Sequence, residues 1–391
     1  MGRESKATRE TRGPLAGIRI VELGGVGPVP FCCMLLSDLG ADIIRIDRPP
    51  GYDGGAPVDP RFNLLNRGRR SAALDLKNRA GVEAVLELVR GADVLVEGFR
   101  PGVAERLGLG PDDCLAVNPA LVYGRMTGWG QDGPLAQAPG HDVGYVSLTG
   151  VLHSIGTVDG PPVIPLNLAG DFGGGSLYLA MGVLSALLES RDSGHGQVVD
   201  AAMVDGSASL MTLFYGLRAA GYWNDRRGTN RLDSGAPWYG VYETKDGLWL
   251  SVAANEARFW RNFLAFIGLP EKDMPEQHDR SRWPDMRERI AAVLRTRSRD
   301  EWCASAQGQD VCITPVLSLA EAPHHPHLQE RGTFIEVEGV VQPAPAPRFS
   351  RTPGAVRRPP ARPGENTEEA LSDWGFTAAD LAALRAAGAI T

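Results

Sequence analysis

Two residues of kinds that can transfer a proton, His141 and Asp171, lie beside glycines in the middle of the chain. His141 stands between Gly140 and Asp142, and Asp171 is followed almost at once by Gly173-Gly-Gly175. Glycine lets the backbone approach a ligand closely, because it has no side chain. A histidine and an aspartate in this setting could grip a small group and act on it as acid and base. Each also has a plainer interpretation, since most histidines are structural and an aspartate can simply cap a helix.

A long apolar run follows Asp171. From Leu177 to Leu188 only Tyr178, Gly182 and Ser185 interrupt the apolar residues, which predicts a helix buried on all sides. Asp171 and the glycines would then lie just ahead of this helix. The free N–H groups and the positive end of the helix dipole would then face a ligand bound beside Asp171.

The first half of the chain alternates between short apolar stretches and amphipathic ones. We expect strands at 18–23, 41–47, 73–77, 92–97, 121–126 and 197–203, and helices at 31–39, 78–89 (capped by Asn78) and 205–220. This alternation predicts an α/β fold with a doubly wound, parallel (Rossmann-like) sheet that binds ligands at its strand ends. Gly25-Val-Gly27 with Asp47 imitates a dinucleotide fingerprint, but Pro28, Pro30 and the missing third glycine argue against NAD.

Four cations lie at or just beyond the ends of the expected strands: Arg48, Lys77, Arg100 and Arg106. Arginine suits phosphate groups, because its guanidinium donates two parallel hydrogen bonds. Any one of these side chains is more simply explained as a solvated surface residue. Four of them on the ligand edge of one sheet favour an anionic ligand.

The second half of the chain predicts a smaller α+β domain. We expect a large domain over 13–220, a crossing linker over 221–235, the small domain over 236–320, and a return linker with a C-terminal helix over 321–391 that packs on the large domain. The small domain should contain a hairpin at 239–253, a helix from Asn255 to Gly268 and two further helices at 284–296 and 299–307. The Pro-rich stretch 343–363 should be extended. Glu256 lies in the first turn of its helix, where the dipole favours an acid in any case.

Composition narrows the class of protein. The chain has 391 residues, 43% of them hydrophobic and 22% charged, with a net charge of −7, which argues against nucleic acid as a general partner. No apolar stretch appears long enough to span a membrane. The charged segment Met1–Arg12 is not a secretory signal, and Gly51–Pro60 should be a loop. Five cysteines without CxxC spacing fit reduced thiols in a cytoplasmic protein. His324-His-Pro-His327 suggests a loop rather than a metal site.

Several stretches together form a specific pattern that covers residues 13 to 350: Pro14–Leu23, Asp38–Asp42, Ile46–Pro49, Glu97–Gly102, Met126–Pro134, Gly140–Asp142, Gly170-Asp171 and Gly196–Met203. With these motifs the chain resembles the family III CoA-transferase group and, within it, the α-methylacyl-CoA racemases. The resemblance implies the fold of that family, an interlocked homodimer, a 2-methylacyl-CoA substrate and a place in fatty acid metabolism. It implies no metal or redox cofactor.

The resemblance also implies roles for individual residues. His141 and Asp171 match the catalytic pair of the racemases, and Glu256 matches a glutamate near the histidine, which we expect to hold His141 in its tautomer from the partner chain. Backbone N–H groups near Asp142 would stabilise the enolate oxygen. The positions that match the family's CoA site are Arg48, Leu74, Asp75, Leu76, Lys77, Gly98, Phe99, Arg100, Arg106, Gly140, Asp142, Val143, Gly144 and Tyr145. Contacts near Gly51–Ala56 are left open, because the family varies in length there.

Three functions from different classes stay open. The first is an isomerase that epimerises the α-carbon of 2-methylacyl-CoA thioesters by deprotonation and reprotonation through an enolate. The second is a family III CoA-transferase with Asp171 as nucleophile; such enzymes usually carry Tyr or Phe at the position of His141, and a longer glycine-rich loop where this chain has Trp249–Asn255. The third is a non-catalytic CoA-binding subunit. His141 and the missing glycine run favour the isomerase.

Overall fold

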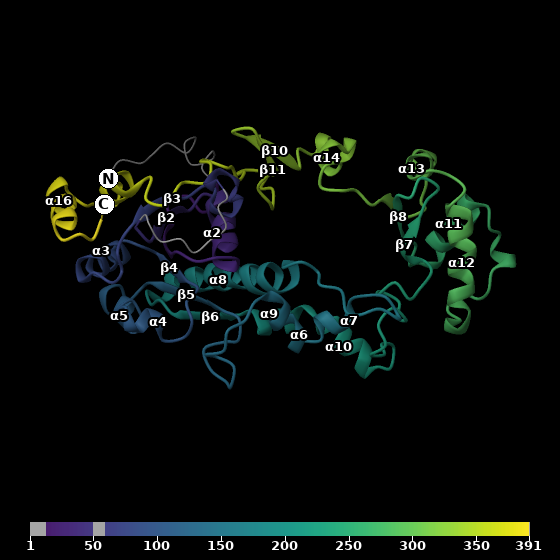
Figure 1. Cartoon of the computed structure of the whole chain (residues 1–391), viewed down its shortest axis with the longest axis horizontal. Helices are drawn as coiled ribbons and strands as arrows, with labels where there is room; N and C mark the ends of the chain where they lie inside the picture. Colours follow the sequence, from purple (N-terminus) through teal and green to yellow (C-terminus); the bar gives the residue numbers. More distant parts are fainter. Residues whose placement is uncertain (1–12, 50–58, 391) are drawn as a thin grey trace. The chain divides into compact units, whose positions relative to one another are not determined.

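The computed structural model describes residues 13–49 and 59–390 of the chain (Figure 1). The charged leader Met1–Arg12 and most of the loop Gly51–Pro60 lie outside the described residues. The chain forms two compact units. Of the described residues, the first unit comprises 13–49, 59–149, 166–210 and 332–390, and the second comprises Gly150–Pro165 and Met211–Arg331.

The first unit is built on a sheet of six strands, all parallel, in the order β3-β2-β1-β4-β5-β6. The strands are β1 (Arg19–Leu23), β2 (Asp42–Asp47), β3 (Arg70–Ala73), β4 (Val94–Glu97), β5 (Val122–Thr127) and β6 (Val198–Ala202). Successive side chains of a strand point to opposite faces. Val21 and Leu23 therefore enter one core, while Ile20 enters the other. Two apolar cores on the two faces of a parallel sheet confirm the doubly wound fold.

Helices cover both faces of this sheet. One core contains side chains from α3 (Arg79–Arg90), α5 (Pro111–Val117), α15 (Thr367–Asp373) and α16 (Ala378–Ala386). The other contains side chains from α2 (Pro28–Asp38), α6 (Asp142–Leu148) and α8 (Leu177–Ser193). Shorter elements connect them: η1 (Pro60–Phe62), η2 (Leu64–Asn66), α4 (Val103–Arg106), α9 (Met203–Leu210) and the hairpin β10 (Phe334–Val337) and β11 (Val340–Pro343). The expected cap at Asn78 is present, because its side chain accepts the N–H of Ala80 at 3.0 Å.

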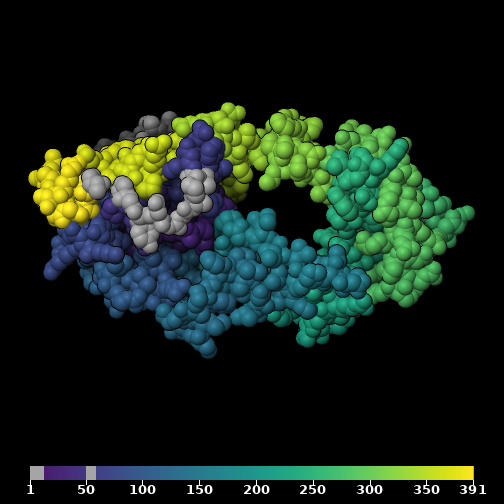
Figure 2. Space-filling model, in the orientation of Figure 1, coloured from purple at the N-terminus to yellow at the C-terminus, as the bar shows by residue number. Residues whose placement is uncertain are grey.

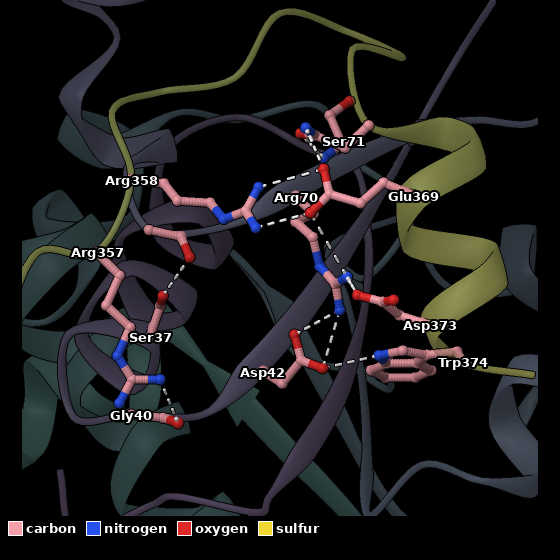
Figure 3. A network of polar contacts seen from close by, with 12 residues as sticks. Ser37, Gly40, Asp42, Arg70, Ser71, Arg357, Arg358, Glu369, Asp373 and Trp374 are labelled. Carbon is pink, nitrogen blue, oxygen red and sulfur yellow. Dashed lines mark hydrogen bonds and ion pairs between the residues drawn. The ribbon is translucent and has the colours of Figure 1, made fainter. Parts of the chain in front are cut away.

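The C-terminal segment packs back on the first unit, as predicted. The late residues of the chain lie against its first strands in Figures 1 and 2. Arg70 at the start of β3 donates to Asp42 of β2 at 2.9 Å and to Asp373 of α15 at 2.6 Å (Figure 3). The indole N–H of Trp374 donates to the same Asp42 at 2.8 Å. The segment is thus held by buried charge as well as by apolar contact.

Two expectations about β3 and α8 were wrong. The third strand covers Arg70–Ala73 and not 73–77, because the ion pairs of Arg70 hide a polar residue inside the sheet. Helix α8 is not buried on all sides: Leu179, Val183 and Leu187 pack in the core, while Leu177, Met181 and Leu188 are exposed. The helix from 205 is also broken at Met211 into α9 and α10 (Thr212–Ala219).

The glycine run does not precede the helix but lies inside it. Residues Leu168–Ser176 form a π-helix, η3, that continues directly into α8. The continuous helix Leu168–Ser193 has 26 residues and is long and apolar enough to cross a membrane by length and composition, which corrects the expectation that no stretch reaches that length. A core helix of a globular protein passes the same test, and one face of α8 packs on the sheet.

The second unit is a smaller α+β domain around its own core. Its sheet has the order β7-β8-β9, all antiparallel, with β7 (Tyr239–Glu243), β8 (Trp249–Ala253) and β9 (Ile313–Pro315). The hairpin β7–β8 was predicted, and β9 was not. The helices are α7 (Val151–Ser154), α10, α11 (Ala257–Ile267), η4 (Glu271–Asp273), η5 (Arg280–Arg282), α12 (Trp283–Leu294), α13 (Arg299–Ala306), η6 (Ala322–His324) and α14 (Pro326–Glu330). Helix α11 is capped by Glu256 rather than by Asn255.

The boundaries of this unit differ from the expected ones. Residues 150–165 and 211–235 belong to it, although the sequence placed the former and part of the latter in the large domain. The reason is contact between distant segments: His153 Nε2 lies 2.7 Å from the carbonyl oxygen of Asp225, and Arg227 donates to the carbonyl oxygen of His153 at 3.3 Å. Residues 332–391 return to the first unit.

The glycine run is explained by the close approach of two helical backbones. A Cβ atom on Gly206 of α9 would lie 1.8 Å from the carbonyl oxygen of Gly174 in η3. We expect Gly206→Ala to force these helices apart and to lower the free energy of unfolding by about 1–3 kcal/mol, measured by urea denaturation. Gly216→Ala in α10 is the control, because no atom lies within 4 Å of its added Cβ. It should be neutral or stabilising by up to about 1 kcal/mol. Equal effects of the two changes would contradict the close approach.

Candidate active site

The carboxyl ends of the six parallel strands form the ligand edge of the first unit. Gly24–Gly27 follow β1, Arg48 follows β2, Leu74–Lys77 follow β3, Gly98–Arg100 follow β4 and Gly128-Trp129 follow β5. The strand order reverses between β1 and β4, and ligands bind at this point in open α/β sheets. The loops after β1 and β4, and the segments that pack beside them, are therefore the expected place for a ligand.

Asp171 lies beside the loop after β1. It is in the first turn of η3, and its Oδ2 atom would be 3.2 Å from a Cβ added to Gly27, the N-cap of α2. The rings of Phe31 in α2 and Phe172 in η3 stack with centroids 4.4 Å apart, which fixes the two elements against each other. The side-chain amide of Asn167 donates to Asp171 Oδ2 at 3.2 Å. The carboxyl group is thus held at the switch point of the sheet.

His141 is the N-cap of α6, although its side chain makes no capping bond. Its imidazole is exposed. The next residue, Asp142, is buried in the first turn, and its Oδ2 atom accepts the backbone N–H of Asp171 at 2.7 Å. This hydrogen bond joins the start of α6 to the start of η3, so the two predicted catalytic segments are brought together.

The pKa of Asp171 is raised above the ordinary value of an aspartate, mainly because burial disfavours the charged form. The hydrogen bond from Asn167 and the attraction of His141 oppose this, while the charge of Asp142 adds to it. The hydrogen bond between Asp142 and the Asp171 backbone places His141, the residue before Asp142, on a segment that meets the start of η3. A histidine and a carboxyl group on two adjoining segments are candidates for a pair of proton carriers.

Two aromatic side chains, Trp129 and Tyr145, pack against each other next to Gly128 and Gly140. The rings of Trp129 and Tyr145 meet edge to face with centroids 4.7 Å apart. Cβ atoms on Gly128 and Gly140 would lie 2.1 Å and 2.6 Å from Tyr145, so both positions need glycine. Burial, with the charge of Asp171, raises the pKa of the Tyr145 hydroxyl. Tyr145 belongs to the predicted CoA set, and its burial makes it part of the frame of the site.

The four predicted CoA-binding cations are all exposed. Arg48, Lys77 and Arg100 lie in the loops after β2, β3 and β4, and Arg106 is the last residue of α4. Lys77, Arg100 and Arg106 form no ion pair with any residue of 13–49 or 59–390. The arginines inside the first unit behave differently, since Arg69 pairs with Glu22 at 2.7 Å and Arg125 pairs with Glu97 at 2.8 Å. Lys77, Arg100 and Arg106 are thus suited to an anionic ligand.

The other residues of the predicted CoA set differ in which of their atoms are accessible to a ligand. Leu74 is fully buried in the core, so only its backbone could meet a ligand. Gly98 and Phe99 are set by Glu97, whose Oε2 accepts the N–H of Phe99 at 2.7 Å. Asp75 and Leu76 are half-buried, Val143 is exposed, and Gly144 lies in the first two turns of α6.

Glu256 lies in the second unit, where it is the exposed N-cap residue of α11. Its expected role toward His141 stays a prediction. The structure gives no support for NAD binding at Asp47. Its carboxylate forms an ion pair with Arg45 at 2.6 Å and accepts a hydrogen bond from Ser71 at 2.5 Å, so it already has partners within the protein. Within the described part of the chain, no group of three or more His, Cys, Asp or Glu side chains could hold a metal ion.

Three residues around the pair escaped sequence reasoning: Gly27, Asn167 and Trp129. Gly27 was seen only as part of a poor dinucleotide fingerprint, although its φ of 73° signals a special backbone position. Asn167 lies four residues before Asp171, a spacing that brings side chains together on a helix, but the helix was not expected to begin so early. Trp129 lies just after the fifth strand, where a site residue is favoured.

The fold is thus that of a parallel α/β protein whose switch point lies between β1 and β4. The sequence profile of CoA-transferase family III matches residues 15–367. The chain belongs to CoA-transferase family III.

Similar proteins support this assignment at high coverage. The alpha-methylacyl-CoA racemase of Mus musculus is 43% identical over 370 residues, which cover 94% of this chain and 95% of that protein. The human protein of the same name is 42% identical with the same coverage. The crystal structure of a CAIB/BAIF family protein from Brucella suis has a TM-score of 0.80 and 26% identity, and it covers 93% of this chain and 100% of that one.

The raised pKa of Asp171 predicts how stability depends on pH. The folded state favours the protonated carboxyl, so this group contributes stability that is complete below its unfolded pKa of about 3.9 and is lost as pH rises through the folded pKa. Asp171→Asn, which is neutral at every pH, should therefore melt a few degrees above the unmodified protein at pH 7. Thermal unfolding between pH 4 and 7 should show this gap narrowing toward acid. A variant that is less stable at pH 7 would contradict the unfavourable burial of charge.

Proposed function

We propose that this protein is an isomerase that epimerises the α-carbon of 2-methylacyl-CoA thioesters. The observation that carries the proposal is geometric: the hydrogen bond from the Asp171 N–H to Asp142 Oδ2, at 2.7 Å, joins the start of η3 to the start of α6, where His141 is the N-cap. Two proton carriers suit a reaction that removes a proton from one face of a carbon and returns one to the other. The racemases of mouse and human, 43% and 42% identical to this chain, support the same reaction and substrate class.

In this mechanism the α-proton of the thioester is removed by one group of the pair and an enolate forms. The proton is only weakly acidic, so removal needs a positioned base and a stabilised enolate oxygen. His141 serves one face and Asp171 serves the other, and their roles exchange when the opposite enantiomer is bound. The backbone N–H of Asp142, in the first turn of α6, has no acceptor within its own helix and is the candidate donor to the enolate oxygen.

The CoA part of the substrate would bind along the ligand edge of the sheet. Arg48, Lys77, Arg100 and Arg106 would contact its phosphates, since they are exposed and follow the carboxyl ends of β2, β3 and β4. The backbone of Leu74–Lys77 and of Gly98–Arg100 would line the same edge. Arg100 also acts electrostatically on Tyr145, so one of these cations lies near the catalytic pair.

The second candidate is a CoA-transferase that uses Asp171 as nucleophile to form an acyl-enzyme anhydride. The family as a whole supports it. Asp171 must be ionised both to attack a thioester and to remove an α-proton, so its pKa does not separate the two functions. His141 separates them, because the transferases usually carry Tyr or Phe at this position and a racemase needs a second proton carrier. A non-catalytic CoA-binding subunit has no use for such a pair.

Deuterium uptake separates these functions. A chiral 2-methylacyl-CoA incubated with the protein in deuterated water, with no acyl acceptor present, should gain α-deuterium and racemise. His141→Ala and Asp171→Ala should each lower the rate by about 10²- to 10⁴-fold while CoA affinity stays close to normal. A transferase would instead form an acyl-Asp171 that hydroxylamine traps, and it would not need His141. A His141→Ala protein that racemises at full rate would overturn the proposal.

We also propose that the protein is a homodimer. Exposed apolar side chains gather on α8, where Leu177, Met181 and Leu188 lie on one face and 57% of Met181 is accessible. Leu166, Leu168 and Leu210 add to the exposed apolar surface of the first unit, and Leu213 and Tyr215 of α10 do so in the second. Faces of this kind mark protein interfaces, and the interlocked dimer implied by the family would cover them.

Met181→Arg tests the dimer. A charge buried in an apolar interface costs several kcal/mol, so this variant should sediment as a monomer or aggregate at micromolar concentration, whereas the unmodified protein should sediment as a dimer. Ala383→Arg, which adds the same charge at an exposed position of α16, should leave the dimer intact. A folded, active monomer of the unmodified protein would contradict the proposal.

The proposal also covers the location of the protein and its use of cofactors. We propose a cytoplasmic enzyme of fatty acid metabolism that needs no metal or redox cofactor. All five cysteines are free thiols, and Cys32 and Cys33 are fully buried, which supports a reducing compartment.

A further inference from the structure

Asp142 stands between the two catalytic segments and contacts the backbone of one of them. Its Oδ2 atom accepts the N–H of Asp171 at 2.7 Å, and 8% of the residue is exposed. A Cβ atom on Gly170 would lie 2.3 Å from the same oxygen. The residue before Asp171 must therefore be glycine for the carboxylate to come this close. The contact depends on that geometry and cannot be an incidental surface interaction.

The other oxygen of Asp142 is unusual. Oδ1 is buried and has no hydrogen-bond partner among the described residues. A buried acceptor without a donor costs about 1–3 kcal/mol, so stability alone does not account for a carboxylate here. His141, not Asp142, is the N-cap of α6, so the Asp142 side chain does not cap this helix, although the dipole favours an acid in the first turn. The charge of Asp142 also acts on the neighbouring Asp171.

The charged and titratable groups around Asp171 come from a small number of elements. The start of α6 supplies His141 and Asp142, and Tyr145 lies one turn further on, with Arg100 acting on Tyr145 from the loop after β4. The turn of η3 itself supplies the amide of Asn167, and α2 presents Gly27. Asp142 is the negative charge in this group that acts on Asp171.

The chemistry explains why such a charge is useful. In a reversible two-base isomerisation each group must act as base in one direction and as acid in the other. An ordinary histidine titrates near 6.5 and an ordinary aspartate near 3.9, so an aspartate is too weak a base for its partner. Burial raises the pKa of Asp171, and the charge of Asp142 raises it further, so the Asp171 carboxylate is a stronger base than an ordinary aspartate.

We propose that Asp142 is a positioning residue of this site: Oδ2 fixes the backbone of Asp171, and its charge makes the Asp171 carboxyl a better proton acceptor. The inference rests on the proposed isomerase function for its purpose, but the contact and the charge effect are properties of the protein alone. It assigns to the side chain of Asp142 a role separate from that of its backbone N–H.

Two variants separate the two parts of this role. Asp142→Asn keeps a carbonyl oxygen that can accept the N–H of Asp171 but removes the charge, whereas Asp142→Ala removes both. In the pH profile of α-deuterium exchange, the acid limb should move to lower pH in Asp142→Asn, because the neighbouring negative charge is gone. Asp142→Ala should show the same shift and a further loss of roughly 10- to 100-fold at the optimum, because Asp171 is no longer held. An acid limb that stays in place in Asp142→Asn would overturn the proposal.

A second measurement needs no activity. The ¹³C resonance of the Asp171 carboxyl, assigned by its absence in Asp171→Asn, should titrate at lower pH in Asp142→Asn than in the unmodified protein. An unchanged titration would overturn the inference even if the enzyme isomerises its substrate. A shifted titration in a protein that exchanges no α-deuterium would uphold it and refute the proposed function instead. Asp112→Asn, which removes an exposed first-turn carboxylate from α5, is the control and should change neither readout.

Discussion

The position of the site depends on the contact between two helical backbones that only glycine permits. Gly174 in η3 and Gly206 in α9 approach so closely that a Cβ on either would meet the backbone of the other segment, at 1.8 Å for Gly206 and 2.6 Å for Gly174. Each glycine in a helix costs about 1 kcal/mol relative to alanine. The run Gly173–Gly175 is therefore unfavourable locally, and the packing against α9 accounts for it. That packing carries Asp171 to the loop after β1.

Buried charge fixes the loops on both sides of the switch point. Glu22 near the end of β1 pairs with Arg69, which also donates to the carbonyl oxygen of Pro30 at the start of α2. Glu97 at the end of β4 pairs with Arg125 and accepts the N–H of Phe99. Breaking such a pair leaves an uncompensated buried charge, so each holds its loop firmly. Arg69 and Arg125 are thus buried arginines that help to build this edge of the sheet.

Sequence periodicity predicted the sheet well, because strands buried on both faces are short and continuously apolar. It failed at Arg70–Ala73, where the arginine is neutralised by Asp42 and Asp373, residues that are distant in the chain. It failed again at η3, because glycines are read as breaks and the helix that tolerates them depends on α9. The divided second unit was missed for the same reason: the contact between His153 and Asp225 is not a local property.

The predicted site residues divide in a similar way, into those that the local sequence identified and those that only the fold could identify. His141 and Asp171 were identified from their glycine neighbours, and the cations were identified from their places after strands. The side chain of Asp142 was not, because it meets Asp171 only through a fold that brings residues 142 and 171 within hydrogen-bond distance. Asn167 was missed because the helix was not expected to begin so early. An aspartate in this fold can serve as nucleophile or as proton carrier, and the residue itself is the same in both cases. Its neighbours decide between them: a carboxyl that is buried, opposed by another carboxylate and placed beside a histidine is suited to holding and releasing a proton. The fold places the carboxyl of Asp171 beside the switch point of the sheet. Whether such a carboxyl acts as a nucleophile or as a proton carrier then depends on the groups that surround it.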